Sequence, residues 1–282
     1  MSIPTGILSK TCKKFKLMKG FEEKVVWITG ASSGIGEALV YEFVRRGAIV
    51  IASSNQEEEL ERVKDSCGDE SNRVNVVPLD LASSDNFSVI AEEQVLKLGR
   101  IDFLINLGGV SQRSTVEETP LWLDRKIMEI NYFGTIALTK AVLPFMIKQK
   151  RGHVLATSSI SGRFGFPLRS AYSASKQALH GFFETLHIEN HKNGINASVI
   201  IPGRVRTNIS KNALTRTGDA HGKMDQGQAK GITAEKAALQ IIKGIKRNKR
   251  EILVGSTELI MLYIRKYFPS IFFNFAGRIK PE

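Results

Sequence analysis

The stretch that decides the fold is "VVWITGASSGIGEALVYEFV", residues 25–44. An apolar run typical of a buried strand leads into a turn with glycines at positions 30, 34 and 36, and a helical pattern follows. Glycine lets the backbone turn tightly and approach a phosphate, and a helix N-terminus offers free N–H groups and a partial positive charge. This strand–turn–helix context predicts a dinucleotide phosphate site at Gly30, Ser32, Ser33, Gly34, Ile35 and Gly36.

The same alternation of strand and helix continues along the chain from residue 24 to residue 255. We expect strands at 24–29, 48–53, 73–80, 101–106, 152–159, 196–203 and 251–255. We expect helices at 34–47, 56–67, 85–99, 121–149, 171–190 and 233–248. Apolar strands joined by helical crossovers indicate an α/β, Rossmann-type doubly wound parallel sheet of about seven strands, with helices on both faces. Ligands bind such sheets at the carboxyl ends of the strands.

The composition is typical of a globular protein from the reducing, cytoplasmic compartment. The 282 residues are 42% hydrophobic and 24% charged. The two cysteines and five scattered histidines form neither a disulfide framework nor a zinc spacing, so we expect no metal. We expect one catalytic domain over residues 22–255, preceded by a basic arm over residues 1–21. The net charge of +12 attracts anions in general, but charge alone does not indicate nucleic acid, and we expect none.

The end of the second expected strand indicates which dinucleotide fits. An acid there would bind the ribose 2′-hydroxyl and repel a 2′-phosphate, but the sequence offers Ser54 and Asn55. NADP(H) is therefore favoured, although NAD(H) also fits because no Arg or Lys lies in that turn to bind the phosphate. Asp80, which ends the third strand before Leu81, accepts from the adenine amino group or caps the following turn.

A candidate reactive pair lies in "YSASK", residues 172–176. Tyr172 and Lys176 are four residues apart, so a helix places them on one face. A phenol has an ordinary pKa of about 10, and a neighbouring ammonium lowers the pKa by favouring the phenolate. The pair therefore suits general acid/base catalysis near neutral pH. Ser159 ends the strand before this helix, where its hydroxyl can reach the same point.

Several motifs in order resemble the short-chain dehydrogenase/reductases: "TGASSGIG", "NLGG", "NYFG", "SS", "YSASK" and "PGRVRT". The resemblance covers about residues 22–255. It implies that Tyr172 donates or accepts the proton, while Lys176 binds the nicotinamide ribose and lowers the tyrosine pKa. It implies that Ser159 orients the substrate carbonyl and that Asn131 holds a water in a proton relay. It also places four residues beside the nicotinamide: Pro202, Gly203, Val205 and Thr207.

The resemblance has one departure, after the fourth expected strand. The family usually has N-N-A-G there, and this chain has Asn106, Leu107, Gly108 and Gly109. Backbone contact with the cofactor through Asn106, Gly108 and Gly109 is compatible with this change. The bracing hydrogen bonds of the side chain that Leu107 replaces are lost.

Two segments bear on the substrate and on partners. Residues 204–232 are polar and irregular, and we expect a substrate lid there. Residues 256–282 are apolar and basic, but too interrupted to span a membrane. This extension either packs over the pocket or a dimer contact, or lies in a membrane interface with its basic residues at the headgroups. Together with "NLGGVSQRS" it resembles in part the member-7 group, which is linked to hydrophobic carbonyls.

We therefore expect an NADP(H)-preferring enzyme that interconverts a small hydrophobic ketone or aldehyde and its alcohol. The helices at 121–149 and 171–190 resemble the dimer surface of the family, which implies a homodimer or homotetramer. One alternative is a 3-oxoacyl carrier-protein reductase, because a basic surface suits an acidic carrier. Another is a dinucleotide-sensing protein without turnover, for which the Leu107 departure is the best feature.

Overall fold

The computed structural model describes residues 20–276, so nearly all of the expected basic arm and the end of the C-terminal extension lie outside the described residues. Seven strands form one parallel sheet in the order β3-β2-β1-β4-β6-β7-β9, which confirms the predicted fold class. The strands are β1 (Val25–Thr29), β2 (Ile49–Ser53), β3 (Val74–Val76), β4 (Phe103–Asn106), β6 (Gly152–Thr157), β7 (Ile195–Pro202) and β9 (Glu251–Val254). β3 is shorter than expected because Pro78 has no N–H to donate to a ladder.

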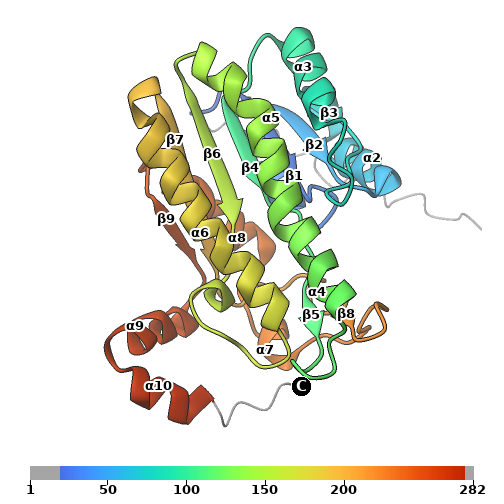
Figure 1. Ribbon diagram of the computed structural model, residues 1–282. Coiled ribbons are helices and arrows are strands. Elements are labelled where there is room, and N and C mark those ends of the chain that lie inside the picture. The colour runs from blue at the N-terminus through green and yellow to red at the C-terminus, as the bar shows by residue number, and fades with distance from the viewer. Residues whose placement is uncertain (1–19, 277–282) are drawn as a thin grey trace, which may run out of the picture.

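Helices cover both faces of this sheet (Figure 1). One face carries α1 (Gly34–Val44), α2 (Glu57–Asp65) and α8 (Ala234–Lys246). The other carries α3 (Phe87–Leu98), α4 (Leu121–Met128), α5 (Gly134–Lys148) and α6 (Ser170–Asn190). Short helical turns complete this part: η1 (Gly68–Arg73), η2 (Glu129–Phe133), η3 (Ile160–Gly162) and η4 (His191–Asn193).

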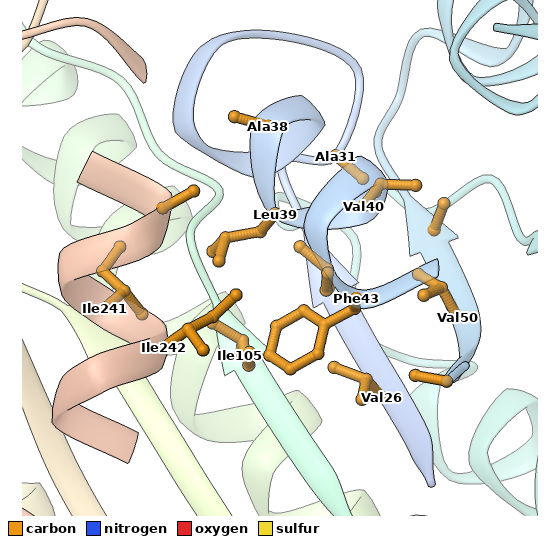
Figure 2. Close-up of a cluster of buried hydrophobic side chains, with 14 of the residues drawn as sticks. Val26, Ala31, Ala38, Leu39, Val40, Phe43, Val50, Ile105, Ile241 and Ile242 are labelled. Atoms are coloured by element: carbon orange, nitrogen blue, oxygen red, sulfur yellow. The ribbon is translucent and has the colours of Figure 1, made fainter. Parts of the chain in front are cut away.

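The core is divided by the sheet into two apolar layers. Figure 2 shows the first, in which Phe43 and Leu39 of α1 face Ile241 and Ile242 of α8 above strand residues such as Ile105. The buried side chains hold α1 against the sheet, because removing apolar surface from water is the main favourable contribution to folding. The start of α1 is thereby fixed beside the end of β1.

The carboxyl ends of the strands carry the elements that the sequence did not predict. β5 (Gln112–Arg113) pairs with β8 (Leu214–Thr215), and α7 (Gln226–Ala229) follows within the expected lid. η5 (Thr257–Leu259), α9 (Ile260–Tyr267) and α10 (Pro269–Ala276) form the described part of the C-terminal extension. Figure 1 shows β5, β8, α7, α9 and α10 gathered at this end of the molecule. They surround the edge at which a doubly wound sheet binds ligands.

The expected helix at 121–149 contains one irregular turn. η2 is a π-helical turn between α4 and α5, and such turns are frequent at functional sites. Within the described residues, the stretch Leu121–Lys148 is long and apolar enough to cross a membrane by length and composition alone. In the fold it packs on the sheet through Leu138, Val142 and Met146.

Candidate active site

The glycine turn after β1 forms a cradle in which side chains have no room. Gly30 and Gly34 have φ of +65° and +57°, which glycine adopts without strain. A Cβ on Gly36 would lie 2.0 Å from the carbonyl oxygen of Gly30, and one on Gly30 would lie 2.8 Å from the nitrogen of Gly108. The turn therefore lies against the loop that follows β4, at the point where the strand order reverses between β1 and β4. A nicotinamide dinucleotide fits this cradle, because backbone rather than side chains lines it.

One cavity of about 830 Å³ joins this cradle to the reactive pair. It is lined by Gly30, Ser32, Ser33, Gly34, Ile35, Gly36, Ser54, Asn55, Asp80, Leu81, Gly108, Ser159, Tyr172, Lys176, Pro202, Gly203, Val205 and Thr207. These are all of the expected site residues except Asn106 and Asn131, which are buried behind it. The fold thus brings residues that follow six strands, β1, β2, β3, β4, β6 and β7, to one space.

The end of β2 is polar, as the sequence predicts. The hydroxyls of Ser32 and Ser54 lie 3.0 Å apart, and Ser32 also donates to the side chain of Gln56 at 3.2 Å. Arg62 of α2 reaches the carbonyl of Ser32 at 3.2 Å. A guanidinium therefore lies near this turn, although the turn itself contains no basic residue. This guanidinium was not predicted at the site, because Arg62 belongs to the next helix rather than to the turn.

Other residues supply the bracing that Leu107 removes. Asn106 donates to the carbonyl of Leu155 at 3.1 Å and to the hydroxyl of Thr139 at 3.3 Å. The hydroxyl of Thr29 accepts from the backbone N–H groups of Leu107 and Gly108, both at 3.1 Å. The Leu107 side chain packs against the first core layer. The loop after β4 is therefore held by its backbone and by the neighbouring strands.

Tyr172 and Ser159 lie together, as expected. Ser159 accepts from the N–H of Ser161 at 3.1 Å, and its hydroxyl is close enough to the Tyr172 phenol to lower the pKa of that group. Burial raises the pKa of Tyr172, and the opposing effects that lower it come from Arg169, Ser159 and Arg113. The prominent cations beside the phenol are thus two arginines that the sequence did not single out.

Lys176 differs from its expected arrangement. Its ammonium donates to the carbonyl of Thr157 at 2.8 Å and lies 5.9 Å from the centre of the Tyr172 ring. Burial lowers the pKa of Lys176 to about 8, so the ammonium stays mostly protonated at neutral pH and loses its charge in mildly basic solution. Lys176 lines the cavity, where its remaining N–H groups can meet a ribose hydroxyl.

The Asn131 side chain connects η2 to the loop after β4 and to α6 by hydrogen bonds. Its side-chain oxygen accepts from the N–H of Val110 at 2.8 Å. Its amide nitrogen donates to the carbonyl of Val110 at 2.9 Å and to the hydroxyl of Ser175 at 3.0 Å. These three hydrogen bonds hold the side-chain amide, and the relay water that the resemblance implies at Asn131 stays a prediction. Asn131 lies in η2 and joins this helical turn to α6 and to the loop after β4.

Gln112 positions the start of α6, a role that was not predicted from the sequence. It is fully buried in β5, and its oxygen accepts from the N–H groups of Ala171 and Tyr172 at 2.9 and 3.3 Å. These are orphan donors of the first turn of α6, which would otherwise lack partners. Gln112 therefore fixes the helix start from which Tyr172 projects.

Charged side chains gather at the substrate end of the cavity. Arg113 of β5 forms a two-point ion pair with Asp225, which precedes α7 in the expected lid. Arg169, at the start of α6, donates to the same carboxylate at 2.8 Å. Glu258 of the C-terminal extension also reaches the cavity and accepts from the N–H of Arg204 at 2.9 Å. The extension thus contacts the loop after β7.

One group with ligand-type atoms lies among the described residues: His180, Glu184 and Glu251, within 4.8 Å of one another. Two of these side chains already have protein partners. Arg163 forms an ion pair with Glu251, and the ring of His180 lies 2.8 Å from the Ser158 hydroxyl.

Comparison with known proteins places the chain in a family. The model of the short chain dehydrogenases matches residues 24–217, well over half of the chain. Dehydrogenase/reductase SDR family protein 7-like of Drosophila melanogaster is 42% identical over 89% of this chain and 78% of its own length. Dehydrogenase/reductase SDR family member 7B of Xenopus tropicalis is 36% identical over 100% of this chain and 94% of its own length. A Burkholderia phymatum short chain dehydrogenase/reductase, crystallised in complex with NAD, shares the fold with a TM-score of 0.79 at 22% identity, over 89% of this chain and 95% of that chain. The chain therefore belongs to the short-chain dehydrogenase/reductase family of oxidoreductases and resembles its member-7 proteins.

Proposed function

We propose that the protein interconverts a hydrophobic ketone or aldehyde and the corresponding alcohol, with Tyr172 as the general acid and base. The carrying observation is that Tyr172 and Ser159 line the same cavity as the glycine turn and lie close enough for the serine hydroxyl to affect the pKa of the phenol. Ser159 can hold the reacting oxygen, and the buried phenol can give that oxygen a proton during reduction or take one during oxidation. A bound nicotinamide dinucleotide would supply or accept the hydride.

Residues 22–255 form the catalytic domain in this proposal, with 204–232 as the substrate lid. NADP(H) is the preferred dinucleotide, because Ser54 and Asn55 follow β2 without an acid, while Arg62 near the turn is paired with Glu37 and Glu59. The structural relative that contains NAD supports NAD(H) as the second choice. The ratio of kcat/KM for NADPH to that for NADH tests this preference, and a value below one would reverse it.

Tyr172→Phe tests the catalytic assignment. We expect turnover to fall by about a hundredfold or more, since general acid–base catalysis contributes 10²–10⁴-fold. Dinucleotide binding, measured by fluorescence titration, should persist because the glycine turn is untouched. Near-normal turnover of the variant with a hydrophobic carbonyl would contradict the assignment.

We further propose that the protein forms a homo-oligomer and contacts membranes peripherally. Trp122 of α4 and Phe133 of η2 are exposed on the helices expected at the dimer surface. Phe268 and Phe273 are exposed on the extension, near Lys266, as in an interfacial helix. We expect co-sedimentation with vesicles containing phosphatidylserine, reduced in a Phe268→Ser/Phe273→Ser double variant. Leu96→Ser, at an exposed site on α3 away from the expected dimer surface, is the control, and equal binding by all three proteins would contradict membrane contact through the extension.

A further inference from the structure

Two guanidinium groups share one carboxylate at the substrate end of the cavity. Arg113, Arg169 and Asp225 all line it, and their side chains are 4%, 20% and 13% exposed. One positive charge therefore remains without a matching acid in a half-enclosed space. The other carboxylates of the lining have partners elsewhere: Asp80 accepts from Ala82, and Glu258 accepts from Arg204 and Ser256.

The unmatched charge belongs to Arg169. Every guanidinium nitrogen of Arg113 has a partner, since Nε and Nη2 bind Asp225 and Nη1 donates to Ser111 and to the carbonyl of Gln112. Arg169 donates from Nη2 alone, to Asp225. Its Nε and Nη1 have no acceptor among residues 20–276. Hydrogen bonds to ionised groups are the strong ones, so these nitrogens favour an anion.

The position of Arg169 is built into the fold. Its guanidinium carbon lies 5.0 Å from the centre of the Phe166 ring, which fixes the plane of the group. Leu168, immediately before it, has φ of +62°, a conformation that costs a residue with a side chain roughly 1–2 kcal/mol. Such strain persists where the surroundings over-determine the backbone, and it is concentrated at ligand-binding sites.

Arg169 and Tyr172 line the same cavity, three positions apart in the sequence. Arg169 is close enough to Tyr172 to affect its ionisation, and the two side chains belong to the first turn of the same helix and the residue before it. Phe164, Phe166 and Pro167 add apolar walls to the same part of the cavity. This part of the cavity therefore suits an apolar chain with one anionic end.

We propose that the substrate carries a carboxylate or similar anionic group, which binds the free nitrogens of Arg169 while its carbonyl or hydroxyl meets Tyr172. This inference rests on the proposed oxidoreductase function and specifies its substrate class as aliphatic oxo or hydroxy acids. Arg113 and Asp225 orient Arg169 and leave its remaining nitrogens to the ligand.

The test compares a series of aliphatic oxo acids of increasing chain length with their methyl esters. In the wild-type protein we expect the acid to exceed its ester in kcat/KM by about tenfold or more, because hydrogen bonds to charged groups contribute about 1.5–3 kcal/mol. Arg169→Gln should bring this ratio towards one, and Arg169→Lys should restore part of it. Arg247→Gln removes the same charge from an exposed position at the C-terminal end of α8, away from the cavity, and should leave the ratio unchanged.

A binding measurement separates this inference from the proposed function. Decanoate and inorganic phosphate are titrated calorimetrically into the wild-type and Arg169→Gln proteins, whose folding is compared by circular dichroism. Decanoate binding that weakens about tenfold in the variant supports the anion site even if no carbonyl compound is turned over, a result that would overturn only the oxidoreductase proposal.

Two results would overturn the inference. In the first, neutral ketones and esters are turned over as fast as the acids. This result would leave the oxidoreductase function standing but would contradict a substrate with an anionic group. In the second, phosphate binds as tightly as decanoate and displaces it, which makes Arg169 a site for free phosphate or for a cofactor phosphate.

Discussion

At the scale of single residues, the ionisation of Tyr172 decides what the site can do. Burial raises the pKa of the phenol, while Arg169, Ser159 and Arg113 lower it. The spacing of "YSASK" drew attention to Lys176, but that ammonium binds the carbonyl of Thr157. The local sequence therefore identified the tyrosine, whereas its electrostatic environment comes from residues distant in sequence as well as from its helix.

Arg169→Gln should shift the pH dependence of alcohol oxidation. Removing this guanidinium raises the pKa of Tyr172 further, and oxidation needs the deprotonated phenol as the base. The acidic limb of the profile of kcat/KM should therefore move to higher pH, measured with a neutral alcohol to avoid the anion effect. Arg247→Gln is the matched control, and a limb that moves to lower pH would contradict this assignment.

At the scale of elements, the apolar periodicity predicted the seven strands and the helices between them, because each pattern is local. It could not predict β5 and β8, two-residue strands that form only when the segments around positions 113 and 214 meet. The ion pair of Arg113 and Asp225 spans 112 positions and depends on the same meeting. The glycine turn and Ser159 were found because each is fixed by its own strand end, whereas Gln112, Arg113 and Asp225 were missed because tertiary contacts give them their roles.

Two Gly→Ala substitutions should differ in their effects: one should weaken dinucleotide binding, and the other should raise the free energy of unfolding. Gly36→Ala places a Cβ 2.0 Å from the carbonyl oxygen of Gly30, so the turn must shift and dinucleotide binding should weaken at least about tenfold. Gly181→Ala, on the exposed face of α6, meets nothing within 4 Å. It should raise the free energy of unfolding by roughly 0.5–1 kcal/mol, because glycine is a poor helix former. Urea unfolding and fluorescence titration check both variants, and unchanged dinucleotide binding by Gly36→Ala would contradict the cradle.

At the scale of the whole molecule, the sheet and the helices on its two faces bury polar side chains as well as apolar ones. His153 of β6 is 6% exposed and meets the hydroxyl of Ser198 at 2.7 Å. Burial lowers the pKa of both His153 and His180 to about 4. Both rings are therefore neutral in the folded protein at neutral pH, and the folded state resists protonating them.

Stability should therefore fall as the pH falls from about 6.5, the ordinary pKa of histidine, towards 4. In that window the unfolded chain binds protons that the folded chain does not, so the free energy of unfolding decreases with acidity, on the order of 3 kcal/mol for each ring. His153→Gln should reduce this dependence by about half, since one of the two rings is removed. Urea unfolding across this pH range measures it. The exposed His191→Gln is the control, and an equal effect of the two substitutions would contradict the assignment to burial.

The shared carboxylate of Asp225 also has a kinetic consequence. Asp225 belongs to the proposed lid, whereas Arg113 and Arg169 belong to the body of the domain, so the lid opens only when these ion pairs separate. Dissolved salt screens exposed charges over a Debye length of about 8 Å at physiological ionic strength, but it screens buried ion pairs much less. Added sodium chloride should therefore weaken capture of an anionic substrate by the open protein and raise KM, while kcat changes little because the closed ion pairs are sheltered. Substrate affinity would then follow the ionic strength of the surroundings, whereas the rate of lid opening would not.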